Sequence, residues 1–114
     1  MAKANVLDAA PVFAALGDET RLRLVARLCD EGPMSLSRLT EKAGADVTRQ
    51  AVTKHLHLMH DAGLVGETRM GRESVWPLVP KRLEDAVDYI DEISKQWDDA
   101  IDRLRAFVET NDQE

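Results

Sequence analysis

The last third of this chain carries an uninterrupted amphipathic pattern, and this pattern constrains the fold more than any other feature. Residues 80–107 contain no glycine and no proline after Pro80, and their apolar residues recur at intervals of three, four or seven, which is the spacing of one face of an α-helix. At 1.5 Å per residue, this helix would be about 40 Å long. A chain of 114 residues suits one domain, and a domain of that size cannot cover so long a stripe by itself.

The helix is therefore expected to pack against another copy of the chain. A dimer is the simplest arrangement, although the pattern leaves higher oligomers open. The predicted interface residues share the apolar face of the helix: Leu83, Val87, Ile90, Ile93, Trp97, Ile101 and Leu104.

Glycines and helix-capping residues divide the preceding segment into four shorter helices, expected over residues 9–16, 18–30, 35–43 and 48–62. Stops are expected at Gly17, Gly32-Pro33, Gly44 and Gly63, because glycine readily adopts the backbone conformation that ends a helix. The predicted N-caps are Asp18, Ser35 and either Asp46 or Thr48. The second helix is expected to bury Leu22, Val25, Ala26 and Cys29, and the fourth Val52, Leu56 and Met59.

Two short strands are expected between the fourth helix and the long one. Residues 64–70 and 74–78 would form a hairpin across Gly71-Arg72, with Pro77 at an unpaired edge position. The predicted fold is mainly α: a winged helix-turn-helix of four helices, a β-hairpin wing and a long C-terminal dimerisation helix. The whole chain, 1–114, is expected to be a single domain, with a winged-helix core over 9–79 and the dimerisation helix over 80–110.

The net charge of −6 is distributed unevenly along the chain. Residues 1–80 carry ten basic and ten acidic side chains, whereas residues 81–114 carry five basic and eleven acidic ones. A local basic surface can bind phosphate despite the overall charge, because salt screens charges beyond about 8 Å. The acidic C-terminal segment would have to point away from such a partner.

Cys29 is the only cysteine, which excludes an intrachain disulfide and fits a reducing compartment. No secretory signal and no membrane-spanning stretch is visible, so a cytoplasmic location is expected. Phosphate-binding loops and nucleophile motifs are also absent from the sequence, so the chain is not expected to be an enzyme.

The fourth predicted helix presents side chains of the kinds that contact DNA. Arginine pairs with guanine, glutamine with adenine, threonine with either base or the thymine methyl group, and lysine with phosphate. The candidate DNA-binding residues of this helix are Arg49, Gln50, Thr53 and Lys54, with Thr48 and His57 at the margin. They cluster toward the N-terminus of the helix, the end that enters the major groove in helix-turn-helix proteins. An ordinary solvated helix face is the alternative interpretation.

Arg69 and Arg72 lie near the expected hairpin turn and are the candidate DNA contacts of the wing. Glu67 and Glu73 are close enough in sequence to neutralise them. His55, His57 and His60 raise the question of a metal site, but no cysteine or clear carboxylate completes a tetrahedral ligand set. No metal and no cofactor is expected, His55 is interpreted as a half-buried histidine bonded to backbone, and Cys29 is expected to be buried and inert.

Four segments resemble the ArsR-type winged helix-turn-helix repressors: VFAALGDETRLRL (12–24), TRQAVTKHL (48–56), DAGLV (61–65) and GRES (71–74). The resemblance covers about residues 9–110. It implies a homodimer that binds an operator and usually represses transcription, with double-stranded DNA as its partner and the first and last helices at the dimer interface. It also implies DNA contacts at the positions named above.

Metal-sensing members of that family carry a Cys-x-Cys pair near the third helix, or His and Asp ligands in the last helix. Here the third helix has no cysteine and residues 81–114 have no histidine. The chain resembles instead a branch with Gln-Trp near the middle of the last helix, here Gln96-Trp97, in which no metal ligands are expected. Its turn over residues 44–48 is about two residues longer than the family's usual one.

Two alternatives to a DNA-binding regulator remain open. The acidic C-terminal segment and the modest local basicity would suit a winged-helix protein-interaction module that has lost specific DNA binding. The histidines or Cys29 would suit a metal or redox sensor. The sequence does not identify an operator or a small-molecule effector.

Overall fold

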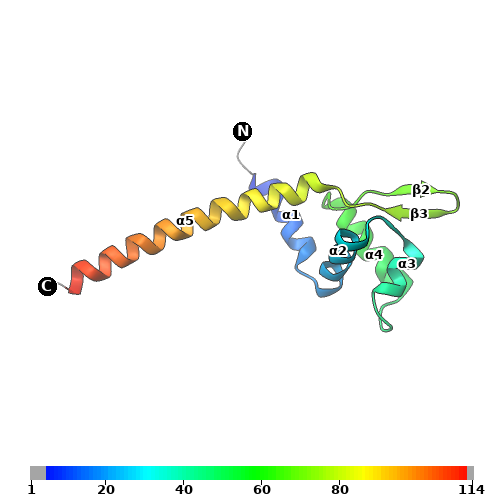
Figure 1. The fold of residues 1–114 in the computed structure, drawn as a ribbon, viewed down its shortest axis with the longest axis horizontal. Helices are drawn as coiled ribbons and strands as arrows, with labels where there is room; N and C mark the ends of the chain where they lie inside the picture. Colours follow the sequence, from blue (N-terminus) through cyan, green and yellow to red (C-terminus); the bar gives the residue numbers. More distant parts are fainter. Residues whose placement is uncertain (1–4, 113–114) are drawn as a thin grey trace.

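The computed structural model describes residues 5–112 and shows an elongated molecule of 73 × 35 × 22 Å. Four helices and a small sheet gather at one end, and the last helix extends away from them (Figure 1). The helices are α1 (Val6–Leu16), α2 (Glu19–Glu31), α3 (Leu36–Lys42), α4 (Arg49–Asp61) and α5 (Pro80–Asp112), and the strands are β1 (Met34–Ser35), β2 (Thr68–Met70) and β3 (Glu73–Trp76). The predicted mainly α winged helix-turn-helix fold is confirmed.

Side-chain caps determine where the helices begin. The carboxylate of Asp18 accepts a hydrogen bond from the Arg21 amide at 3.0 Å, and the hydroxyl of Thr48 accepts from the Ala51 amide at 3.0 Å. These bonds satisfy amides that have no partner inside the helix. Helix α1 begins at Val6, three residues earlier than expected, because Asn5 acts as its cap and Pro11 is accommodated inside the helix.

The expected buried face of α2 is confirmed for Val25 and wrong for Leu22, Ala26 and Cys29. The structure buries Leu24, Val25 and Leu28, whereas Leu22 is 53% exposed and Ala26 and Cys29 also face outward. The helix carries two overlapping apolar rows that share Val25, and both have helical spacing. The row that packs against α1, α3 and α4 is the one that is buried.

The sheet has three strands in the order β1-β3-β2, so it contains one strand more than the expected hairpin. Met34 pairs with Trp76 and Ser35 with Val75 in antiparallel register. The expected edge position of Pro77 is wrong: β3 is the central strand, and it ends at Trp76, before the proline. Proline has no amide hydrogen to donate to a ladder, but the carbonyl of Pro77 accepts from the Gly66 amide at 2.9 Å.

The first turns of α5 pack against α1 and reach Gly63, which follows α4. Ala86 is buried there, and the rings of Phe13 and Tyr89 lie 6.3 Å apart. The Arg82 guanidinium pairs with Asp8 of α1 and with Asp85 of α5, both at 3.1 Å. Beyond this junction α5 continues without a neighbouring element (Figure 1). None of the helices described within residues 5–112 carries an apolar stretch long enough to cross a membrane.

Candidate nucleic-acid interface

Helix α4 is oriented by its buried side. Val52, Leu56 and Met59 are completely buried against the core, as the sequence predicts. Since a helix turns by about 100° per residue, burial of these three residues turns Gln50, Lys54 and His57 to the opposite, exposed side. These three side chains therefore form a row along the outer surface of α4, beginning in its first turn.

Thr48 and Thr53 make local hydrogen bonds within α4. Thr48 is its N-cap, and the hydroxyl of the half-buried Thr53 donates to the Arg49 carbonyl at 2.9 Å. The hydroxyl proton of Thr53 is thus already engaged, so its methyl group and oxygen lone pairs are what it can offer to a base edge.

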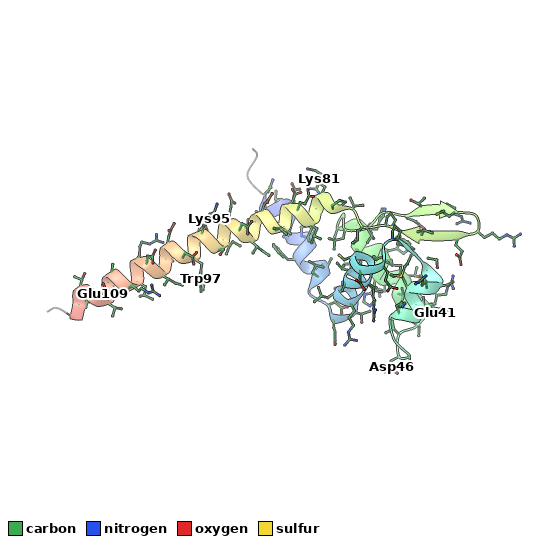
Figure 2. All side chains as sticks on the ribbon, viewed as in Figure 1. Glu41, Asp46, Lys81, Lys95, Trp97 and Glu109 are labelled. Atoms are coloured by element: carbon green, nitrogen blue, oxygen red, sulfur yellow. The ribbon has the colours of Figure 1, made fainter. Side chains whose placement is uncertain are left out.

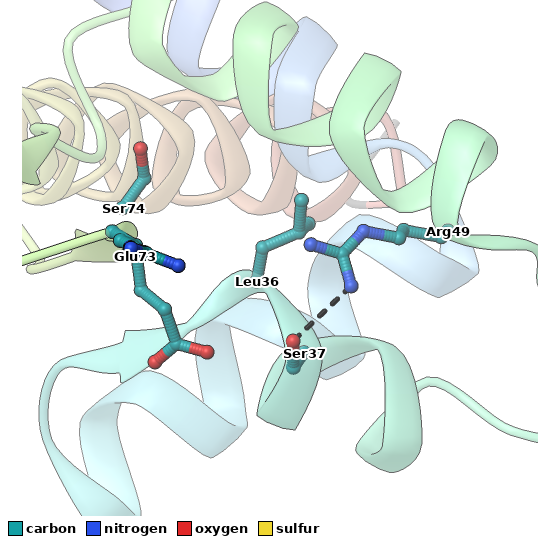
Figure 3. Close-up of a pocket in the computed structure, with 6 residues that line it drawn as sticks. Leu36, Ser37, Arg49, Glu73 and Ser74 are labelled. Atoms are coloured by element: carbon teal, nitrogen blue, oxygen red, sulfur yellow. Dashed lines mark hydrogen bonds between the residues drawn. The ribbon is translucent and has the colours of Figure 1, made fainter.

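Arg49 lies on the flank of α4 that faces α3, and not on the outer face where the sequence interpretation placed it. Its Nη1 donates to the Oγ of Ser37 in α3 at 3.1 Å (Figure 3). The α-helical position explains the difference, because Arg49 is one residue from Gln50 and so points about 100° away from it.

The wing is the hairpin formed by β2 and β3. Met70 pairs with Glu73 across the two-residue turn Gly71-Arg72, which confirms the predicted turn. Gly71 has a φ of +65°, and glycine is favoured at such a position because it has no Cβ. Arg69 and Arg72 are both exposed. Of the two carboxylates that could neutralise them, Glu67 accepts from the Ser74 hydroxyl at 2.7 Å, and neither Glu67 nor Glu73 forms an ion pair with these arginines.

Ion pairing separates the basic residues of the molecule into two groups. The arginines and lysines that pair with a carboxylate are Arg23, Arg27, Arg38, Lys42 and Arg82. Within residues 5–112, no carboxylate lies within 4.0 Å of the cationic groups of Arg49, Lys54, Arg69 and Arg72. Among residues 5–112, the other lysines and arginines without such a partner are on α5, among its surplus of carboxylates, apart from Arg21, which bonds to backbone carbonyls. The cations of α4 and the wing, which we call the basic cluster, thus form no ion pair with a carboxylate of the described residues.

Helix α5, which carries the surplus of acidic residues, leads away from α4 and the wing (Figure 1). The acidic C-terminal segment therefore points away from the candidate phosphate-binding surface, as the uneven charge distribution requires. The field of a basic patch falls off within about a Debye length, roughly 8 Å at physiological salt, so the distant part of α5 affects the cluster little.

The predicted interface residues of α5 divide at the junction with α1. Leu83 is half-buried and packs on the chain's own core. Farther along, Val87, Ile90, Ile93, Trp97 and Leu104 are exposed, and Ile101 is half-buried. Trp97 and Leu104 are 67% and 61% exposed, and Trp97 leaves α5 on the side opposite to Lys95 (Figure 2).

The model of a helix-turn-helix domain family matches residues 16–67 of the chain. A relative from Bacillus subtilis, the uncharacterized HTH-type transcriptional regulator YuzN, is 40% identical over 68 residues, which are 56% of this chain and 74% of the relative. An ArsR-like transcriptional regulator from Rhodococcus sp. RHA1 has a similar structure, with a TM-score of 0.73, 31% identity, and coverage of 89% of this chain and 92% of that one. The chain belongs to the ArsR family of helix-turn-helix transcriptional regulators.

A third similar structure shares the fold alone. It is the homodimeric winged helix-turn-helix DNA-binding domain of a possible ArsR-family transcriptional regulator from Mycobacterium bovis, with a TM-score of 0.61 and 18% identity over 86% of this chain and 85% of that one. YuzN and the Rhodococcus protein are both described as transcriptional regulators.

The histidine side chains of this ArsR-family regulator contact other side chains of the protein. His57 and His60 contact Trp76 edge-on, with ring centroids 5.9 and 6.5 Å from that of the tryptophan. Among residues 5–112 there is no group of three or more His, Cys, Asp or Glu side chains that could hold a metal ion. His57 is exposed on the outer row of α4, so its role in DNA binding stays a prediction.

The expected backbone partner of His55 is wrong. Its Nδ1 lies 3.1 Å from Nη1 of Arg21, whose Nε donates to the carbonyl of Ala15 at 2.6 Å. Arg21 therefore connects the end of α1 to α4. The backbone amide of Arg21 lowers the pKa of Asp18 below its ordinary value of 3.8, because it donates a hydrogen bond to the carboxylate, and the nearby Arg21 and His55 side chains act in the same direction.

The sequence interpretation missed Ser37 and Arg21 as parts of this surface and its support. Nothing in the local sequence distinguishes Ser37, which is a half-buried serine of a short helix. Its contact with Arg49 depends on how α3 and α4 pack. Arg21 belongs to the segment that resembles the family, but its partners are 6 and 34 residues away in sequence.

Proposed function

We propose that this ArsR-family regulator binds a palindromic DNA operator as a homodimer and represses transcription. The observation that carries the proposal is the set of cations on α4 and the wing, Arg49, Lys54, Arg69 and Arg72, which form no ion pair with a carboxylate within residues 5–112. Phosphate oxygens are suitable partners for such cations, and released counterions add to the affinity.

The outer row of α4, formed by Gln50, Lys54 and His57, would recognise the base sequence. Gln50 in the first turn can bond to the N6 and N7 edge of adenine, and Lys54 one turn later can reach phosphate or guanine. Thr53 would contact a thymine methyl group or a base edge beside them. In this arrangement α4 occupies the major groove, as the second helix of a helix-turn-helix does.

The exposed stripe of α5 supports the homodimer. A helix without tertiary contacts is only marginally stable in water, and the far half of α5 has few within residues 5–112. A hollow of about 200 Å³ lined by Trp97, Ala100, Ile101 and Leu104 offers space for a side chain from a second α5. The similar structure from Mycobacterium bovis is itself homodimeric.

A two-fold symmetric dimer presents two copies of α4, which would enter successive major grooves about 34 Å apart and read a palindrome. Repression is the mode that the resemblance to ArsR-type repressors implies. A dimer seated on two half-sites would compete with polymerase wherever the operator overlaps a promoter.

The test begins with selection of bound sequences from a randomised 30-base-pair duplex library. The selected duplex and a scrambled control are then titrated with the protein at two salt concentrations, and the stoichiometry is measured by sedimentation. We expect enrichment of a palindrome, two chains per duplex, and an affinity that falls steeply with salt. Weak, equal binding to both duplexes would refute the proposal and favour the protein-interaction module.

Repression requires its own measurement. The selected operator, placed over a promoter in a transcription assay with purified polymerase, should give less transcript when the protein is added. More transcript would indicate activation and contradict that part of the proposal.

A further inference from the structure

A small notch separates the N-terminal end of α4 from the wing. It has a volume of about 140 Å³ and is lined by Leu36 and Ser37 of α3, Arg49 of α4, and Arg72, Glu73 and Ser74 of the wing (Figure 3). We propose that this notch holds a phosphate of the DNA backbone, so that Arg49 binds this phosphate and does not contact a base. This inference rests on the proposed function and assigns a role within it.

The geometry of duplex DNA supports this assignment. The sugar–phosphate backbone is the ridge between the major and the minor groove. A protein that places a helix in the major groove and a hairpin tip toward the neighbouring minor groove must straddle that ridge. The notch is the hollow between those two elements, so the backbone would pass through it.

Arg49 is directed toward the notch by its bond to Ser37. Nη1 of Arg49 donates to Ser37 Oγ at 3.1 Å, and in Figure 3 the guanidinium extends along the α3 side of α4. A guanidinium has five N–H donors, so this bond leaves others for a phosphate. Because Ser37 acts as the acceptor and its hydroxyl has no acceptor among the described residues, its proton is also available.

The notch has a net positive charge, which one carboxylate reduces. Arg49 and Arg72 contribute two cations and Glu73 one carboxylate, which comes from the opposite side of Leu36 in Figure 3. The Ser74 hydroxyl already donates to Glu67, so Ser74 would not serve the phosphate. Replacement of Glu73 by glutamine should therefore strengthen binding to every duplex by removing the opposing charge.

Phosphate contacts and base contacts have different signatures. Loss of a phosphate contact weakens binding to all sequences and lowers the salt slope by about 0.9 for each phosphate, whereas loss of a base contact relaxes specificity at one position. The proposal therefore makes a prediction that a base-reading role for Arg49 does not share.

The experiment compares wild type, Arg49→Ala, Ser37→Ala and Glu73→Gln on the selected duplex, on a scrambled duplex and on single-base variants of the selected site, over a range of salt. Arg103→Ala is the matched control, because it removes an exposed arginine of α5 that also has no carboxylate partner within residues 5–112. Sedimentation and thermal unfolding monitor dimerisation and folding for each variant.

We expect Arg49→Ala to weaken binding at least about tenfold on selected and scrambled duplexes alike, with unchanged base preference and a salt slope lower by about 1.8 for the two subunits. Ser37→Ala should weaken binding about three- to tenfold, and less when Arg49 is already alanine. Glu73→Gln should strengthen binding to both duplexes.

Loss of preference at one base pair in Arg49→Ala, with an unchanged salt slope, would overturn the assignment while leaving the proposed function intact. Failure of the wild type to bind any duplex selectively would overturn both. If the Ser37→Ala variant and the Glu73→Gln variant each bound DNA with wild-type affinity, the notch would not be part of the interface.

Discussion

At one end of the molecule, α4 and the wing expose cations that form no ion pair with a carboxylate of the described residues. At the other end, α5 exposes Trp97 and Leu104, which have no apolar neighbour from residues 5–112 that covers them. Both surfaces lack a partner in the single chain, but the missing partners differ in chemistry. Salt screens charge and does not weaken apolar burial. Raising the salt concentration should therefore release DNA while the dimer persists.

The largest expected effect is at the apolar end. Glutamate at both Trp97 and Leu104 would place charges inside the proposed interface, where they would be desolvated without partners. We expect a monomer by sedimentation and a loss of helical ellipticity at 222 nm. We also expect operator affinity to fall by at least about a hundredfold, because the two half-sites are then no longer bound together.

Ala106→Glu is the control for this pair. Ala106 is exposed on the side of α5 away from the stripe, so glutamate there adds charge without entering the interface. A variant carrying both Trp97→Glu and Leu104→Glu that stayed dimeric would show that the stripe is not the contact between subunits.

The next effect is at the basic end. Lys54→Ala should weaken operator binding about tenfold or more and lower the salt slope, because a cation in contact with phosphate is lost, while the dimer survives. Lys95→Ala on the outer side of α5 should leave both quantities unchanged. An unaltered titration curve for Lys54→Ala would remove Lys54 from the DNA surface.

A smaller effect is expected where the two regions join. Gly63 follows α4 with a φ of +81°, and a Cβ there would meet Arg82 Cγ of α5 at 2.5 Å. Gly63→Ala should lower the free energy of unfolding by about 2–3 kcal/mol, because the backbone is strained and Arg82 must shift. Gly71→Ala, with a φ of +65° but nothing within 4 Å of the added Cβ, should lower it by only about 1 kcal/mol. Equal losses in urea denaturation would show that the Arg82 contact costs nothing.

The smallest effect concerns the cap of α2. The pKa of Asp18 is lowered mainly by the hydrogen bond from the Arg21 amide, so the carboxylate stabilises the folded state above its ordinary pKa of 3.8. That contribution is lost as the pH falls through the lowered pKa. Asp18→Asn keeps the cap but not the charge. The wild type should therefore be the more stable protein at pH 7, and its advantage should be lost in acid denaturation as the pH falls below 3.8 and through the lowered pKa. A constant difference between the two proteins would contradict this.

Local signals in the sequence were sufficient for most of the fold. The caps Asp18, Ser35 and Thr48 and the turn at Gly71 act within three or four residues, so the elements they bound could be predicted. The outer row of α4 followed from the same reasoning, because its buried side repeats at helical spacing. The start of α1 was misplaced because the cap at Asn5 precedes the apolar residues from which the helix was predicted.

The candidate site was predicted only in part, because part of it depends on contacts between elements. The positions of Gln50 and Lys54 follow from α4 alone. Helical spacing turns Arg49 about 100° away from Gln50, but its bond to Ser37 exists because α3 and α4 pack side by side. His55 likewise meets Arg21 of α2, which no periodicity within α4 could indicate.

By itself, the sequence determined the order of the helices, their caps, the wing turn and the apolar stripe of α5, since capping and periodicity operate over a few residues. Only the tertiary structure decided which of two apolar rows on α2 is buried, that Met34 and Ser35 add a third strand, and that Arg49 turns toward the notch. Each of these depends on a partner distant in the chain, and several local solutions have similar free energy until that partner packs against one of them.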